Sequence, residues 1–128
     1  MKPHEEWLFK AEHDLKSAEL LLQSAEPLYD IIVYHAQQCA EKALKAFLTS
    51  RMQEIDKSHN LILLVEKCIQ ETAKFNTIYV DCIFLNPYAT LYRYPEGDLM
   101  PDLDEVEKAV VSAKRILDLV KTLLENTH

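Results

Sequence analysis

The chain has 128 residues, of which 48% are hydrophobic and 27% are charged, and it contains one glycine. A chain of this length suits one domain with a buried core. All-β folds need many short strands and glycine-rich turns, so this composition predicts an all-α fold. The net charge of −7 argues against binding of duplex DNA, because that binding depends on many Lys and Arg contacts to phosphate.

The charge is unevenly distributed along the chain. Residues 1–26 carry three basic and six acidic side chains, and residues 96–128 carry four and eight. Residues 42–57 instead carry four basic side chains against two acidic ones. A small anion could therefore be held near this segment, whereas a long polyanion would be repelled elsewhere.

The cysteines and the hydropathy pattern predict a location in the cell. Three cysteines lie in apolar helical runs without the spacing of a zinc site: Cys39, Cys68 and Cys82. We expect core thiols, no bound metal and no cofactor, and such a set fits a reducing cytoplasm. No apolar run approaches about 18 residues and the start, MKPHEEW, lacks an apolar signal core, so we expect no membrane partner and a cytoplasmic protein.

The first predicted helix runs from about His4 to Gln23. Its apolar stripe contains Trp7, Ala11, Ala18 and Leu22. Asp14 falls inside this stripe, within about 20° of Trp7 on an ideal helical wheel. A carboxylate is costly to bury unless it is paired, so we expect Asp14 to be a structural residue of a polar core, capping a helix or pairing with an Arg. A catalytic or ligand-orienting role is the alternative.

The second predicted helix, from about Leu28 to Ser50, has two contrasting faces. Steps of about 100° per residue place five apolar side chains in one stripe: Ile32, Ala36, Ala40, Ala43 and Phe47. The same count brings together hydrogen-bond donors that a core does not require: His35, Gln38, Lys42 and Lys45. The first face predicts core packing and the second indicates a binding surface.

The third predicted helix follows a loop at Gln53–Lys57. Ser58 is a suitable N-cap, which gives a helix over about His59–Thr72. His59 would then lie in the first turn, where backbone N–H groups favour anions. This position makes His59 a candidate ligand residue.

The last third of the chain predicts two further long helices with a short one between them. Apolar residues from Phe75 to Leu85 have helical spacing, and Asn86-Pro87 favours a break followed by a short helix that ends near Tyr92. The segment 93–101 holds two prolines and the glycine, which predicts a loop. Asp102 can cap the last helix, with Glu105 completing a capping box. We therefore expect a single domain, residues 1–128, with an up-and-down bundle of four long helices plus a short fifth.

Three stretches, taken together, resemble the prokaryotic HEPN domain family. They are YHAQQCAEKALKAFL (34–48), SHNL (58–61) and YATLYRYP (88–95). WLFKAEHDLKSAELLL (7–22) is also similar to the first helix of that family, including an Asp at the position of Asp14. The resemblance covers nearly the whole chain, and HAQQxAEKxLK followed by RYP is its most specific part.

This resemblance implies an all-α bundle that usually forms a homodimer. HEPN proteins are often encoded beside a minimal nucleotidyltransferase as toxin–antitoxin or defence pairs, so such a protein is an expected partner. Some members bind nucleotides and others are metal-independent ribonucleases, whose signature is an Arg followed four to six residues later by a His. Here Arg93 is followed by no histidine within that distance, and Arg51 precedes His59 by eight positions. This departure favours a binding protein over an enzyme.

The residues themselves suggest a polar cleft between the second helix, the start of the third and the RYP loop. It would bind a nucleotide or RNA through His35, Gln38, Lys42, His59, Arg93 and Tyr94. Arg offers a planar fork of donors to phosphate, Lys a point charge and Tyr a stacking face for a base. A structural interpretation is equally open: Arg93 pairs with Asp14 or Glu41 and locks the loop to the bundle, while His35 and Gln38 bond helix to helix.

Three functions are consistent with the sequence. The first is a nucleotide- or RNA-binding module that works with a partner protein. The second is a ribonuclease in which His35 or His59 replaces the missing histidine, with Arg93 as a further catalytic candidate. The third is a non-catalytic subunit that covers a nucleotidyltransferase.

Overall fold

The computed structural model describes residues 1–55 and 57–126. Asp56, which belongs to the predicted loop at Gln53–Lys57, and residues 127–128 at the end of the predicted domain lie outside the described residues. The described part contains five α-helices and no strand: α1 (Pro3–Leu22), α2 (Tyr29–Ser50), α3 (Leu61–Glu71), α4 (Tyr79–Leu85) and α5 (Leu103–Glu125). Two short 3₁₀ helices, η1 (Ala73–Ile78) and η2 (Asn86–Ala89), flank α4. The predicted all-α up-and-down bundle is confirmed.

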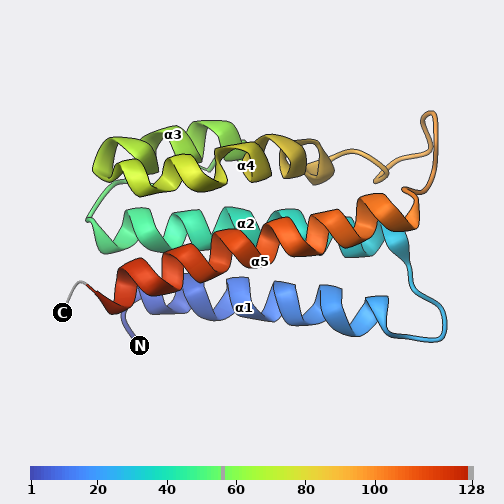
Figure 1. Cartoon of the computed structure of the whole chain (residues 1–128), viewed down its shortest axis with the longest axis horizontal. Helices are drawn as coiled ribbons and strands as arrows, with labels where there is room; N and C mark the ends of the chain where they lie inside the picture. Colours follow the sequence, from blue (N-terminus) through green and yellow to red (C-terminus); the bar gives the residue numbers. More distant parts are fainter. Residues whose placement is uncertain (56, 127–128) are drawn as a thin grey trace.

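The bundle is arranged around α2. Figure 1 shows α1 and α5 running along its length on one side, while α3 and α4 cover the other side. The chain runs along the bundle in α1 and returns in α2, and α1 begins at the same end at which α5 finishes (Figure 1). None of the helices in the described ranges is long and apolar enough to cross a bilayer.

The apolar stripe predicted for α2 is the centre of the core. Ile32, Ala36, Ala40, Ala43 and Phe47 are all fully buried. The small alanines let neighbouring helices approach closely, and the Phe47 ring meets the Phe75 ring edge to face with centroids 4.7 Å apart. An apolar stripe of α5 also faces the core. Val110 is partly buried, and its other members are buried: Val106, Ala109, Ala113, Leu117, Val120 and Leu124.

The end of α2 places the next segment beside the middle of the same helix. Met52 has a positive φ of 59° and follows the C-cap residue. Its N–H bonds to the Thr49 carbonyl and the Gln53 N–H to the Leu48 carbonyl, which is the Schellman pattern usually built on glycine. The chain thereby turns back, and His59 reaches the side chain of Glu41, well before the end of α2.

The start of α3 differs from the sequence prediction. Asn60, not Ser58, is the N-cap, since its side chain accepts from the backbone N–H groups of Ile62 and Leu63. His59 therefore precedes the helix and does not lie in its first turn. Ser, His and Asn stand in a row here, and two of the three are good caps, so the sequence alone could not select the position.

The predicted fourth helix and short fifth helix are both more irregular than expected. The segment over 75–85 divides into η1 and α4, and the short helix is the single 3₁₀ turn η2. Asn86 was expected to cap that short helix, but its Oδ1 accepts from the Leu61 N–H at 2.8 Å. This contact ties η2 to the start of α3.

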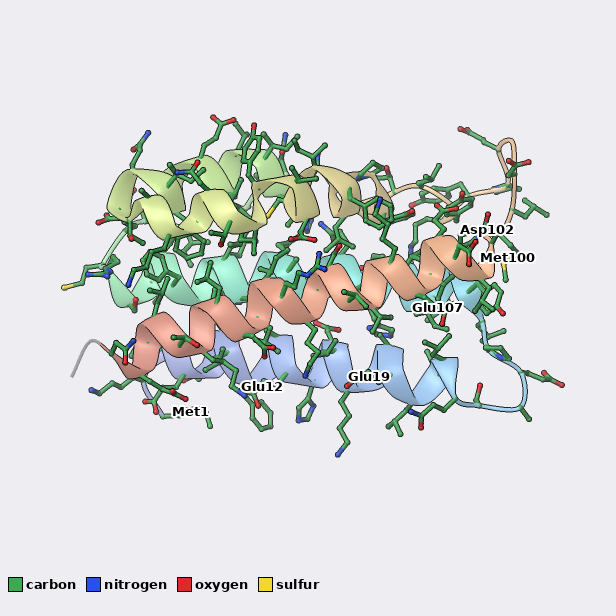
Figure 2. The ribbon with its side chains drawn as sticks, in the orientation of Figure 1. Met1, Glu12, Glu19, Met100, Asp102 and Glu107 are labelled. Carbon is green, nitrogen blue, oxygen red and sulfur yellow. The ribbon has the colours of Figure 1, made fainter. Side chains whose placement is uncertain are left out.

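The loop that follows η2 leads to α5, whose cap is confirmed. The Asp102 side chain accepts from the Glu105 N–H at 2.8 Å, and Met100 and Asp102 lie where the loop meets α5 (Figure 2). The predicted capping box also requires the Glu105 side chain to accept from the Asp102 N–H, and this part of the prediction is wrong. The Glu105 carboxylate instead accepts from the Tyr88 and Tyr92 hydroxyls.

Candidate functional site

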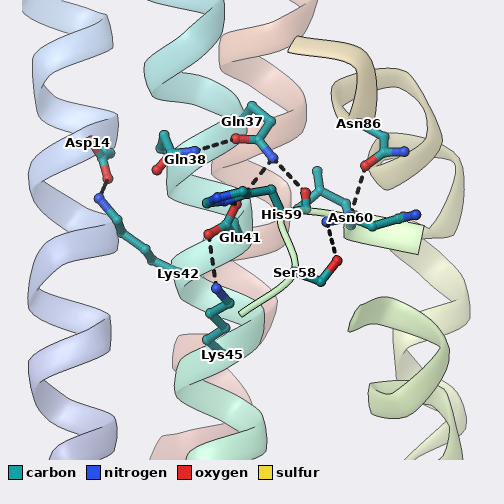
Figure 3. Close-up of polar contacts among 11 residues, drawn as sticks. Asp14, Gln37, Gln38, Glu41, Lys42, Lys45, Ser58, His59, Asn60 and Asn86 are labelled. Carbon is teal, nitrogen blue, oxygen red and sulfur yellow. Dashed lines mark hydrogen bonds and ion pairs between the residues drawn. The ribbon is translucent and has the colours of Figure 1, made fainter. Parts of the chain in front are cut away.

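Two sets of polar side chains occupy one side of α2. Figure 3 shows α2 between α1, which supplies Asp14, and the segment before α3, which supplies His59. Two buried carboxylates, Asp14 and Glu41, each hold one lysine and one histidine. We refer to these as the Asp14 triad and the Glu41 triad.

The Asp14 triad joins α1 to α2. His35 Nδ1 lies 2.9 Å from Asp14 Oδ1, and Lys42 Nζ donates to Oδ2 at 2.6 Å. Burial raises the pKa of Asp14, but the hydrogen bonds from His35 and Lys42 outweigh it and bring the pKa below its ordinary value. The carboxylate is therefore ionised and can only accept, so the His35 Nδ1 atom carries the proton.

The Glu41 triad joins α2 to the segment before α3. Lys45 Nζ donates to Glu41 Oε2 at 3.0 Å, and His59 Nδ1 lies 2.9 Å from Oε1. Both members of the lysine pair are buried, with side-chain exposures of 6% and 4%. The His59 side chain is 68% exposed, so His59 faces solvent while the Glu41–Lys45 pair beneath it is buried. The Lys45 ammonium also lies 5.4 Å from the centroid of the Trp7 ring.

Two glutamines extend the Glu41 triad along α2. Gln38 Nε2 donates to Gln37 Oε1 at 2.7 Å, and Gln37 Nε2 donates to the His59 carbonyl at 3.1 Å (Figure 3). Gln37 is fully buried and its amide is used at both ends. Because buried polar groups are costly when unsatisfied, this arrangement fixes the segment before α3 against α2.

Arg93 reaches the same side of α2 from the loop. Its guanidinium carbon lies 3.8 Å from the centroid of the Tyr34 ring, and Tyr34 in turn makes an edge contact with His35 at 6.1 Å between centroids. Among residues 1–55 and 57–126, no carboxylate lies within ion-pair distance of Arg93. The structural interpretation that Arg93 pairs with Asp14 or Glu41 is therefore wrong, because each of those carboxylates is already held by a Lys and a His.

Tyr94 lies apart from the triads. Its side chain is 69% exposed and lines an open hollow of about 330 Å³ with Tyr92, Pro87 and neighbouring loop residues. The structure thus links His35, Lys42 and Arg93 through Asp14 and Tyr34. It links Gln38 and His59 through Gln37, and Tyr94 makes none of these contacts.

Comparison with known proteins identifies the family. The family model for the HEPN domain matches residues 4–123. The chain belongs to the HEPN family.

One curated relative and two solved structures are similar to nearly the whole chain. The chain is 29% identical to "Putative toxin MJ1304" of Methanocaldococcus jannaschii over 134 positions, which cover 93% of this chain and 86% of that protein. It superposes with a TM-score of 0.78 on ST0689, an archaeal HEPN homologue, at 29% identity over 96% and 98% of the two chains. With TT1696 from Thermus thermophilus the TM-score is 0.82 at 25% identity, over 95% and 98%.

Several members of this HEPN site were missed in the sequence. Gln37 and Tyr34 were not singled out, and Glu41 was considered only as a partner of Arg93, although Glu41 and Lys45 have the i, i+4 spacing of a helical ion pair. Lys45 was counted with the exposed donors and is buried instead. Asp14 is buried, and its partners are a Lys and a His in place of the Arg considered in the sequence.

The geometry gives this HEPN chain two oriented imidazoles. In each triad a carboxylate fixes Nδ1, which leaves Nε2 as the second ring nitrogen, and neither Nε2 has a hydrogen-bond partner among residues 1–55 and 57–126. A carboxylate behind a histidine is an arrangement that suits proton transfer as well as structure. The same described ranges hold no group of three His, Cys, Asp or Glu side chains placed to bind a metal ion.

Proposed function

We propose that this HEPN protein binds a nucleotide or the end of an RNA on the polar side of α2, as one member of a toxin–antitoxin pair. The observation that carries this proposal is the position of Arg93. Its guanidinium stacks on Tyr34 beside His35 and has no carboxylate partner in the described part of the chain. Stacking occupies the face of the guanidinium and leaves its N–H edges available to phosphate.

The charges of the two triads and Arg93 favour a short anion. These groups carry three basic side chains, Lys42, Lys45 and Arg93, against the carboxylates of Asp14 and Glu41, although the whole chain carries −7. A long polyanion would meet repulsion from the acidic remainder of the surface, whereas one or two phosphates would not extend that far. This contrast supports a nucleotide or an RNA end as the ligand.

The toxin–antitoxin role rests on similarity alone. The relative from Methanocaldococcus jannaschii is named as a toxin in the words quoted above, and the HEPN resemblance implies a minimal nucleotidyltransferase as the partner and a homodimer as the assembly. Co-purification with the product of a neighbouring gene supports the pair. A monomeric mass at micromolar concentration in analytical ultracentrifugation contradicts the homodimer.

Titration of a labelled short RNA and of nucleotides against the wild type and Arg93→Ala tests the binding proposal. We expect Arg93→Ala to weaken binding about tenfold or more, since a charge-assisted contact to phosphate contributes about 1.5–3 kcal/mol. Lys114→Ala is the charge-matched control, because Lys114 is exposed on α5, and its affinity should change less than about twofold. Equal or negligible binding by wild type and Arg93→Ala overturns the proposal.

A second candidate function, metal-independent RNA cleavage, is favoured by the Glu41 triad. Glu41 fixes Nδ1 of the exposed His59, so its Nε2 atom could take the proton of a 2′-hydroxyl as that oxygen attacks phosphorus. The 5′-oxygen would leave with a proton from an acid, for which His35 is the candidate. Cleavage in the presence of a chelator, lost in His59→Ala and in His35→Ala, supports this function. Absence of cleavage, or cleavage that survives both changes, eliminates it.

A further inference from the structure

Tyr92, the residue before Arg93, has an unusual backbone conformation. Its φ is +68°, and Met52 is the only other non-glycine residue with a positive φ in the described part of the chain. For an L-residue with a large side chain this region costs about 1–2 kcal/mol, so other contacts must hold it. The backbone N–H of Arg93 bonds to the Thr90 carbonyl at 3.1 Å, which closes the turn that contains Tyr92.

The contacts that hold Tyr92 converge on Glu105. The Tyr92 hydroxyl donates to Glu105 Oε2 at 3.2 Å, and the Tyr88 hydroxyl donates to the same oxygen. The two phenol rings are stacked, with centroids 6.2 Å apart and planes 18° from parallel. The pKa of both phenols is raised, first by burial and then by the Glu105 carboxylate, so both remain protonated donors.

Glu105 is itself fixed to the bundle. Its N–H is held by the Asp102 side chain in the cap of α5, and its carboxylate lies between α5 and the turn after η2. From this anchor the contacts run through Tyr92 to the neighbouring Arg93, and from Arg93 to Tyr34 on α2. The turn is therefore held at α5 on one side and at α2 on the other.

We propose that Glu105 is a positioning residue of the site, which holds the left-handed turn at Tyr92 and thereby places Arg93 against Tyr34. Glu105 does not need to touch the ligand. Without its carboxylate the Tyr92 hydroxyl loses its acceptor, the backbone relaxes to negative φ, and the Arg93 side chain leaves the Tyr34 ring. The consequence for ligand binding rests on the proposed function, whereas the effect on Arg93 does not.

The first arm of the test follows Arg93 directly. The Tyr34 ring should shift the NMR resonances of the Arg93 side chain upfield in the wild type, as ring currents do above an aromatic face. We expect Glu105→Ala to abolish that shift as completely as Tyr34→Leu does, while Asp104→Ala, on the same exposed turn of α5, preserves it. A shift that persists in Glu105→Ala overturns the proposal whether or not the protein binds RNA.

Tyr92→Phe provides a second variant that leaves the cap of α5 intact. It removes the hydroxyl that Glu105 holds, so the Arg93 shift should be reduced even if Glu105→Ala fails to fold. An unchanged Arg93 shift in Tyr92→Phe also overturns the proposal.

The second arm measures affinity for the short RNA in a double-mutant cycle. Glu105→Ala should weaken binding about as much as Arg93→Ala, and the double variant should be no weaker than Arg93→Ala alone. If the fold-losses of affinity of the two single variants multiply in the double variant, Glu105 acts independently of Arg93, and the proposal is overturned. Loss of the Arg93 shift in a protein that binds neither RNA nor nucleotides would support the positioning role of Glu105 and refute the proposed function.

Discussion

Glu41→Gln removes the carboxylate that Lys45 and His59 share, without changing the size of the side chain. In the wild type the Lys45 ammonium is 3.0 Å from Glu41 Oε2, and both side chains are almost completely buried. The amide of Gln is neutral, so the substitution leaves a buried cation without its counter-charge. We expect a large loss of stability from this single change.

The size of the loss follows from the burial of the pair. Breaking a buried ion pair by removing one partner costs about 3–5 kcal/mol. The Gln oxygen can still accept one of the hydrogen bonds, and we therefore expect about 3 kcal/mol, the lower end of that range. Domains of this size have a free energy of unfolding of about 5–15 kcal/mol, so this one change removes a substantial fraction.

Urea denaturation followed by far-ultraviolet circular dichroism measures this free energy of unfolding. Glu107→Gln is the matched control, since Glu107 is exposed on α5 (Figure 2), and its effect should stay within about 0.5 kcal/mol. Glu41→Gln/Lys45→Met removes the unpaired cation as well and should regain about 2 kcal/mol relative to Glu41→Gln. A loss below about 1 kcal/mol for Glu41→Gln, or no recovery in the double variant, would refute this reasoning.

Three further predictions concern the rest of the molecule. Burial raises the pKa of Asp14 in the folded protein, but its hydrogen bonds outweigh burial and lower this pKa below the ordinary 3.8. The ionised Asp14 therefore contributes fully to the free energy of unfolding above pH 3.8, and this contribution is lost as the pH falls through the folded pKa. Urea midpoints should therefore decline less on acidification in Asp14→Asn than in the wild type, and parallel declines would contradict this. Burial raises the pKa of all three free thiols, to about 12 for Cys82, so Ellman's reagent should react only on unfolding; rapid reaction of the native protein would count against the buried assignment. Phe47→Ala should cost about 3–5 kcal/mol in the same urea assay, because its ring is fully buried against Phe75, and a loss below about 1 kcal/mol would contradict that packing.

Helical periodicity alone was sufficient to predict the part of the core that α2 contributes. The stripe from Ile32 to Phe47 is buried as expected, because a 3.6-residue repeat of small and large apolar side chains fits few other arrangements. The ends of helices were predicted less well. Ser58 and Asn60 are comparable caps in isolation, and the choice depends on the Asn86 side chain that meets the Leu61 N–H from a distant part of the chain.

The candidate site was only half predictable for a related reason. His35, Gln38 and Lys42 share a helical face, so their proximity follows from the sequence. The second triad depends on the reversal at Met52, where a methionine adopts the positive φ expected of glycine. Arg93 depends in the same way on the positive φ of Tyr92. Met and Tyr rarely adopt a positive φ, so the sequence does not indicate these two turns. The contacts of His59 and Arg93 that follow from the turns could therefore not be predicted.

The central place of α2 has a consequence for hydrogen exchange. Its amides lie in the helix that is packed by α1, α5 and α3 together, and such elements exchange only when the whole domain unfolds. Arg93 comes from a loop whose neighbouring side chains are mostly exposed, where local opening requires far less free energy. A partly opened form would therefore keep His35 and Lys42 in place on α2 while the loop with Arg93 opens. A ligand that binds Arg93 would then slow amide exchange in the loop and leave the exchange rates of the slow amides in α2 unchanged.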